Sequence, residues 1–184
     1  MRLHALATAA LLAMALSAHA DARTRNVTDP DAPRALPADG SVDVRWTDPS
    51  AFTDIRYSGN RIEAQRGNWV EQLAEHLRTR AEKRLPAGQR LDVEITDIRR
   101  AGSYEPWRGP QLQDVRILRD IYPPRIALRF QLTDAGGVVL SEGQRTLSDP
   151  GYLMGSQVND GDPLRHEKHL IDRWLQREIT APRA

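Results

Sequence analysis

The segment "RIALRFQLTDAGGVVLSEGQRTLS", residues 125–148, decides the kind of fold open to this chain. Its first part alternates apolar and polar residues from Ile126 to Leu132, the period-two pattern of a strand with one buried face. Residues 134–137, Asp-Ala-Gly-Gly, are typical of a tight hairpin turn, and a second strand is expected over residues 138–147. The segment therefore predicts an antiparallel β-hairpin.

Two earlier segments show the same alternation, and turn-forming residues follow both. Apolar and polar positions alternate over residues 42–46 and again over residues 91–96, after which come Asp48-Pro49 and Asp97. A further short edge strand is expected within residues 114–119. Asp, Thr and Ser commonly end strands because their side chains hydrogen-bond the turning backbone. The acidic residues at these strand ends therefore do not indicate an acidic cluster.

Apolar residues recur at helical spacing in two other segments, which predicts two amphipathic helices. Over residues 69–81 the apolar repeat falls every four positions, and Pro86 and Gly88 end the helix. Over residues 164–179 one narrow apolar stripe has Trp174 at its flank. Each helix thus has one face suited to packing on a sheet.

Together these segments predict an α+β fold with a small, mainly antiparallel sheet of three to five strands in β-α-β-β-β-α order. Both helices should pack on one face of the sheet. The strands before and after the first helix should be parallel, with a right-handed crossover between them. The opposite face should remain in water, with its charged residues in cross-strand pairs. Those residues are Asp43, Arg45, Asp92, Glu94, Arg125 and Arg129.

The N-terminal residues resemble a secretory signal. Residues 1–20 combine a positive start, an apolar run and the small-x-small sequence Ala18-His19-Ala20, which predicts a signal peptide cleaved after Ala20. The apolar run is shorter than the roughly 20 residues that span a bilayer, so no stable membrane insertion is expected after cleavage. Residues 21–40 contain three prolines and little apolar content and are expected to be a flexible lead-in. Residues 41–180 should form a single periplasmic domain.

Composition excludes several classes of function. The chain has 26 Lys and Arg residues against 25 Asp and Glu residues, and loss of Arg2 with the signal peptide would balance them. Such a balance gives no general attraction to nucleic acid, so no nucleic-acid partner is expected. The sequence has no cysteine, so it can form no disulfide and carry no lipid on a cysteine.

The stretch "PLRHEKHLIDRW", residues 163–174, has the residue types of a metal site but not the spacing. His166 and His169 are three positions apart, whereas the zinc-protease pattern needs four, and their helical angles place them on the solvent side. The sequence therefore predicts neither a metal nor another cofactor. Glu167 is expected at the edge of the core, with its carboxylate against an arginine.

Two long segments rich in glycine and proline contain the candidate recognition residues. Residues 101–111 include Tyr104, Trp107 and Arg108, and residues 149–163 include Tyr152 and Met154. Tyr, Trp and Arg are enriched at binding hot spots. The alternative is that Trp107 and Tyr152 fold back as lids over the ends of the sheet.

Two functional hypotheses follow from these residues. The first is a non-enzymatic envelope module that recognises a protein or a cell-wall component through the two loops or a sheet edge. The alternative is a periplasmic hydrolase that uses carboxylates such as Asp54, Asp97 or Glu167. The sequence shows no complete catalytic set, which favours the binding module.

Several motifs resemble an uncharacterised exported bacterial family, domain of unknown function 3016. They are "VDVRWTDPSAFTDI", "LDVEITDI", "DIYPPRIALRFQLTDAGG" and "EKHLIDRW", and the resemblance covers roughly residues 41–176. It implies a protein of the Gram-negative envelope. It implies no activity, ligand or catalytic residue.

Overall fold

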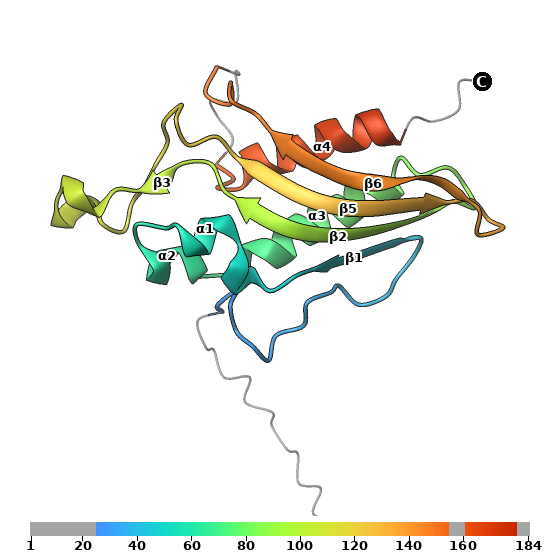
Figure 1. Ribbon diagram of the computed structural model, residues 1–184, viewed down its shortest axis with the longest axis horizontal. Coiled ribbons are helices and arrows are strands. Elements are labelled where there is room, and N and C mark those ends of the chain that lie inside the picture. Colours follow the sequence, from blue (N-terminus) through green and yellow to red (C-terminus); the bar gives the residue numbers. More distant parts are fainter. Residues whose placement is uncertain (1–24, 155–160, 180–184) are drawn as a thin grey trace, which may run out of the picture.

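A mixed four-stranded sheet with the strand order β1-β2-β5-β6 forms the centre of the computed structural model (Figure 1). The structure describes residues 25–154 and 161–179, so the predicted signal peptide lies outside the described residues. The strands are β1 (Val42–Trp46), β2 (Arg90–Arg99), β5 (Arg125–Thr133) and β6 (Val139–Ser148). β1 and β2 are parallel, and the other neighbouring strands are antiparallel. The predicted α+β class is confirmed.

Two long helices pack behind this sheet on the same face (Figure 1). They are α3 (Trp69–Glu82), which contacts β1, and α4 (Arg165–Glu178), which contacts β5 and β6. Because α3 lies in the connection between β1 and β2, those two strands run in the same direction. No helix in the described ranges is long and apolar enough to cross a membrane.

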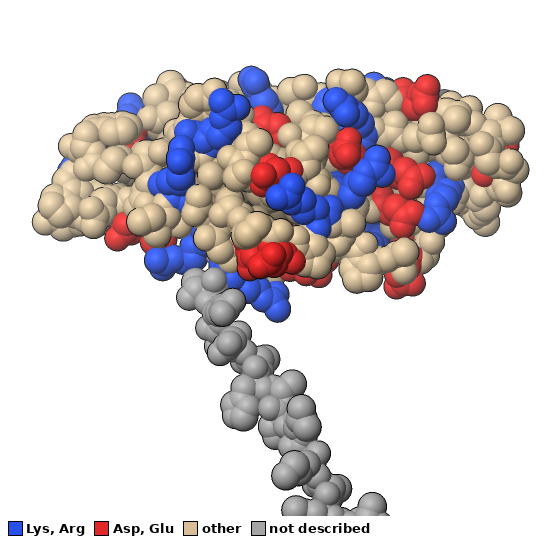
Figure 2. All heavy atoms as spheres, turned by 60° about the horizontal axis from the view of Figure 1, so that its bottom comes forward, with Lys and Arg blue, Asp and Glu red and all other residues tan. Residues whose placement is uncertain are grey.

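The alternation seen in the sequence separates a buried face from a charged one. Ile126, Leu128 and Phe130 are buried against the helices. On the opposite face the Glu94 carboxylate lies 3.2 Å from the Arg45 Nε and 3.5 Å from an Arg129 nitrogen, across both neighbouring strands. Figure 2 shows charges of both signs intermingled on the surface that it presents. Of the six residues predicted to form charged cross-strand pairs, Arg45, Glu94 and Arg129 do so, whereas Asp92 lies opposite Asp43 and Arg125 lies opposite Arg99.

Several short elements were not predicted. After β1 come the 3-10 turn η1 (Pro49–Ala51) and the helices α1 (Thr53–Arg56) and α2 (Arg61–Gln65). After β2 a second sheet pairs β3 (Ser103–Tyr104) with β4 (Arg116–Ile117) and encloses the 3-10 turns η2 (Pro106–Arg108) and η3 (Pro110–Leu112). We call residues 103–122 the β3–β4 lobe; it projects from one end of the main sheet (Figure 1). The short strand expected within residues 114–119 thus pairs inside this lobe.

The described part of the expected lead-in, residues 25–40, is hydrogen-bonded to the domain. The Leu36 N–H donates to the Val44 carbonyl at 3.0 Å, and the Trp46 N–H donates to the Arg34 carbonyl at 2.8 Å. β1 is an edge strand, whose free N–H and C=O groups would otherwise face water. This part of the chain therefore covers the β1 edge, which its composition alone did not indicate.

Candidate functional site

A carboxylate held by two guanidiniums lies where the β3–β4 lobe joins the main sheet. Asp54 is in the first turn of α1 and only 6% exposed. Its two oxygens accept bidentate hydrogen bonds from Arg116 at 3.1 and 2.9 Å. They also accept from the Arg100 backbone N–H and Nε, both at 2.9 Å. One acidic side chain thus joins α1, the end of β2 and the β3–β4 lobe.

Aromatic rings complete the environment of these two arginines. The Arg100 guanidinium lies 4.2 Å from the ring centre of Trp69, and the Arg116 guanidinium lies 4.8 Å from that of Tyr104. Burial alone would raise the pKa of Asp54, but Arg100 and Arg116 outweigh it and lower that pKa below its ordinary value. The carboxylate is therefore charged at neutral pH and unsuited to proton transfer.

A glycine also fixes the position of the lobe, because any side chain in its place would push neighbouring atoms away. Gly102 has a φ of +77°, and a Cβ there would lie 2.7 Å from the Ile117 carbonyl oxygen. The Gly102 carbonyl accepts a hydrogen bond from Arg116 at 3.1 Å. The turn into β3 thus depends on close backbone approach and on the same arginine that binds Asp54.

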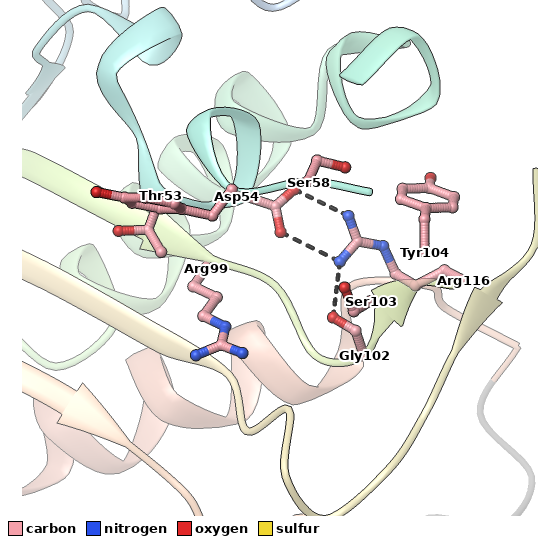
Figure 3. A pocket seen from close by; sticks show the side chains of 9 residues that line it. Thr53, Asp54, Ser58, Arg99, Gly102, Ser103, Tyr104 and Arg116 are labelled. Atoms are coloured by element: carbon pink, nitrogen blue, oxygen red, sulfur yellow. Dashed lines mark hydrogen bonds and ion pairs between the residues drawn. The ribbon is translucent and has the colours of Figure 1, made fainter. Parts of the chain in front are cut away.

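A polar pocket of about 170 Å³ opens beside this cluster (Figure 3). Six of the residues that line it are Thr53, Asp54 and Ser58, which lie in and just after α1, and Arg99, Ser103 and Arg116, which come from β2, β3 and β4. The pocket is much smaller than the roughly 300–1,000 Å³ typical of drug-sized ligands. It therefore suits a small polar group.

A second buried carboxylate organises the interior of the β3–β4 lobe. Glu105 forms ion pairs with Arg108 at 2.5 Å and with Arg119 at 3.0 Å, and it accepts a hydrogen bond from the Tyr122 hydroxyl at 2.9 Å. Its side chain is fully covered. Burial tends to raise the pKa of Glu105, but the bonds from Tyr122 and Arg119 lower it overall. The lobe is thus held by a charged centre, which leaves its apolar side chains free to face outward.

The structure separates the candidate recognition residues into buried and exposed ones. Tyr104 and Tyr152 are 7% and 5% exposed, and the Tyr152 hydroxyl donates to the Arg119 carbonyl at 2.7 Å. Trp107 and Met154, in contrast, are 71% and 91% exposed. The Arg108 side chain is about half exposed, and it forms an ion pair with the buried Glu105. The Tyr152 contact joins the second predicted loop to Arg119 of the β3–β4 lobe.

Two expectations for the "PLRHEKHLIDRW" stretch were wrong. His166 is buried rather than solvated, because the Tyr152 ring packs edge-on against it at 4.8 Å. Glu167 is fully buried, and its carboxylate accepts the Ala101 backbone N–H at 2.6 Å rather than a hydrogen bond from an arginine. Burial raises the pKa of Glu167. Over residues 25–154 and 161–179, no three His, Cys, Asp or Glu side chains are grouped so as to hold a metal ion.

The two arginines that define the site could not be identified from the sequence. Arg100 and Arg116 are 46 and 62 positions from Asp54 along the chain, so no local spacing connects them. The one available signal was that 101–111 is a long irregular segment next to a strand end.

The elements and the pocket define an α+β domain with a lobed extension at one end of its sheet. The sequence matches the family described as "Protein of unknown function (DUF3016)" over residues 40–177, and the chain belongs to that family. The resemblance noted in the sequence is thereby confirmed. No curated protein and no solved structure matches the chain.

Proposed function

We propose that this protein is an exported, non-enzymatic envelope module that recognises another protein through the end of the molecule that carries the β3–β4 lobe. Export rests on the signal-like pattern of residues 1–20. Recognition rests on the arrangement of apolar side chains at that end. The proposal names a protein partner because an apolar surface suits another apolar surface better than it suits a polar glycan.

The observation that carries the proposal is a concentration of exposed apolar side chains. Most of the large ones in the described part of the chain lie in or beside the lobe, on the α1–α2 segment or in the 149–154 loop. These are Tyr57, Ile62, Trp107, Leu112, Val115, Leu118, Ile121, Leu153 and Met154. We call this set the apolar end. Exposed apolar side chains gathered in one region, as distinct from scattered ones, are typical of interaction sites.

Internal contacts keep this surface in a fixed shape. The Asn60 side chain donates to the Gln113 carbonyl at 3.1 Å and to the Asp114 carboxylate at 2.9 Å, which joins α2 to the lobe. Glu105 holds the lobe from inside, and Tyr152 joins the 149–154 loop to it. A surface fixed in this way loses little conformational entropy on binding.

The geometry gives the hydrolase alternative no support. Asp54 is occupied by two arginines, and the Asp97 oxygens accept the Thr53 N–H at 2.6 Å and the Thr53 hydroxyl at 2.7 Å. Glu167 is buried away from solvent. Each of these carboxylates instead holds a backbone segment in place.

Trp107→Ala should remove partner binding without changing the fold. Because the indole is largely exposed, we expect the free energy of unfolding to change by no more than about 0.5 kcal/mol. Loss of an aromatic hot-spot residue should weaken partner binding by tenfold or more. The measurement is thermal unfolding together with retention of envelope proteins on the immobilised wild type and variant.

Val138→Ala provides the matched control. Val138 is also exposed, but it lies at the turn between β5 and β6, at the opposite end of the sheet (Figure 1). The control should retain the same partner as the wild type. If Trp107→Ala retains that partner equally well, or if it destabilises the domain by several kcal/mol, Trp107 is not a recognition residue.

A further inference from the structure

Two arginines face each other where the polar pocket meets the main sheet. Arg99 on β2 and Arg125 on β5 are directly opposed in the antiparallel register. Side chains of such a pair project from the same face with Cβ atoms about 4.5–5.5 Å apart, and like charges in this position repel. On the same face Glu94 pairs with Arg45 and Arg129, whereas Asp43 lies opposite Asp92. Arg99 and Arg125 form a positively charged pair of this kind, and Arg99 also lines the pocket.

Neither arginine is neutralised within the described ranges. Arg99 contacts the Tyr122 ring, with its guanidinium carbon 6.0 Å from the ring centre, and no carboxylate of the described residues lies within ion-pair distance of Arg99 or Arg125. The acidic groups around the pocket are already engaged. Asp54 binds Arg100 and Arg116, Asp97 binds Thr53, and Glu105 binds Arg108 and Arg119. Arg99 and Arg125 therefore have no ion-pair partner among the described residues, and the hydrogen bonds that Asp97 accepts come from the neutral Thr53.

Arg99 also lines the small pocket, together with groups that can donate hydrogen bonds. Figure 3 shows Arg99 and Ser103 among the side chains around the cavity. The Ser103 hydroxyl makes no hydrogen bond to any described residue. The volume of about 170 Å³ accommodates a single small anionic group but not a drug-sized ligand.

We propose that Arg99 and Arg125, with Ser103 at the side, bind an oxyanion, the phosphate or carboxylate group of a ligand. Guanidinium groups bind such oxyanions through paired, charge-assisted hydrogen bonds. An oxyanion between the two guanidiniums would also remove their mutual repulsion. Arg99 and Arg125 lie on the charged face of the sheet, and anion binding there does not require the proposed protein partner.

The test uses thermal unfolding of the whole protein in inorganic phosphate, with ionic strength held constant by chloride. The Tm of the wild type should rise with the logarithm of phosphate concentration above the dissociation constant, by about 5 °C at ten times that constant. A parallel series in acetate shows whether a carboxylate also binds. Titration calorimetry with phosphate gives the affinity directly. Vesicles containing phosphatidylglycerol, with and without competing phosphate, distinguish a lipid headgroup from a soluble anion.

Charge reversal at one of the two arginines distinguishes anion binding from a purely structural role, because only anion binding predicts higher stability together with a lost phosphate response. Arg125→Glu should raise Tm without phosphate, because the new carboxylate pairs with Arg99, and it should abolish the phosphate-dependent rise. Arg99→Gln should weaken phosphate binding at least tenfold. Arg129→Gln, an exposed change on the same strand, should leave the phosphate response intact. The proposal is overturned if wild type responds to neither phosphate nor acetate, or if Arg125→Glu retains the full response.

Discussion

Trp174→Ala should lower the free energy of unfolding by about 3–5 kcal/mol, since it leaves a large cavity in a packed core. Trp174 is almost completely buried on α4, and its ring meets Phe130 of β5 edge-on at 5.5 Å. The indole therefore connects the second helix to the centre of the sheet. Chemical denaturation of wild type and variant, compared at constant m-value, measures the loss.

Trp174→Phe separates the contribution of side-chain volume to stability from the contribution of the indole nitrogen. The Trp174 indole nitrogen is buried without a hydrogen-bond partner in the structure, so its removal relieves a desolvation cost. We expect the phenylalanine variant to lose well under half of what the alanine variant loses. Equal losses for the two variants would mean that the ring is not packed as described.

Asp54→Asn should cost a similar amount, about 3–5 kcal/mol, because it leaves two largely buried guanidiniums without their counter-charge. The lobe should also become looser, since Arg116 then loses its bidentate partner. Hydrogen exchange at the backbone of residues 103–122 reports the loosening, and denaturation reports the stability. A cost below about 1 kcal/mol would contradict the role assigned to this cluster.

Asp43→Asn is the matched control for this substitution. Asp43 also pairs with an arginine, Arg90, but on the exposed face of the sheet. Removing an exposed pair should cost no more than about 1 kcal/mol. The comparison isolates the effect of burial because both variants exchange one carboxylate for an amide.

The pH dependence of the free energy of unfolding should also show the contribution of Asp54. The folded-state pKa of Asp54 is below its ordinary value of 3.8, so its contribution is fully present well above pH 3.8. That contribution is lost as the pH falls below about 3.8 and through the folded-state pKa. The acid-induced loss of stability should therefore be smaller in Asp54→Asn than in wild type.

The main sheet and the two long helices could be predicted because each carries a periodic apolar pattern over many residues. The strand from Arg125 to Thr133 and the helix from Trp69 to Glu82 were found within one or two residues of their observed ends. The helices α1 and α2 have only four and five residues, too few to show a helical repeat. Tertiary contacts with β2 and the lobe hold them in place instead.

The candidate site was harder to predict from the sequence than the main sheet, because segments far apart in the chain form it. The Asp54–Arg116 pair joins residues that no spacing rule relates. A helical wheel places His166 toward water, but it cannot include Tyr152, a loop residue that covers that side of α4. The sequence also left open whether the two loops fold back or project. In the structure Tyr152 folds back and Trp107 projects.

Site-specific photo-crosslinking in cells tests most directly whether the apolar end recognises a protein partner. A photoreactive phenylalanine analogue would replace Trp107 in one strain and Val138 in another, two exposed positions at opposite ends of the sheet. We predict a discrete protein adduct from position 107 and none of the same mass from position 138. No adduct at position 107, or the same adducts from both positions, would contradict recognition through the lobe.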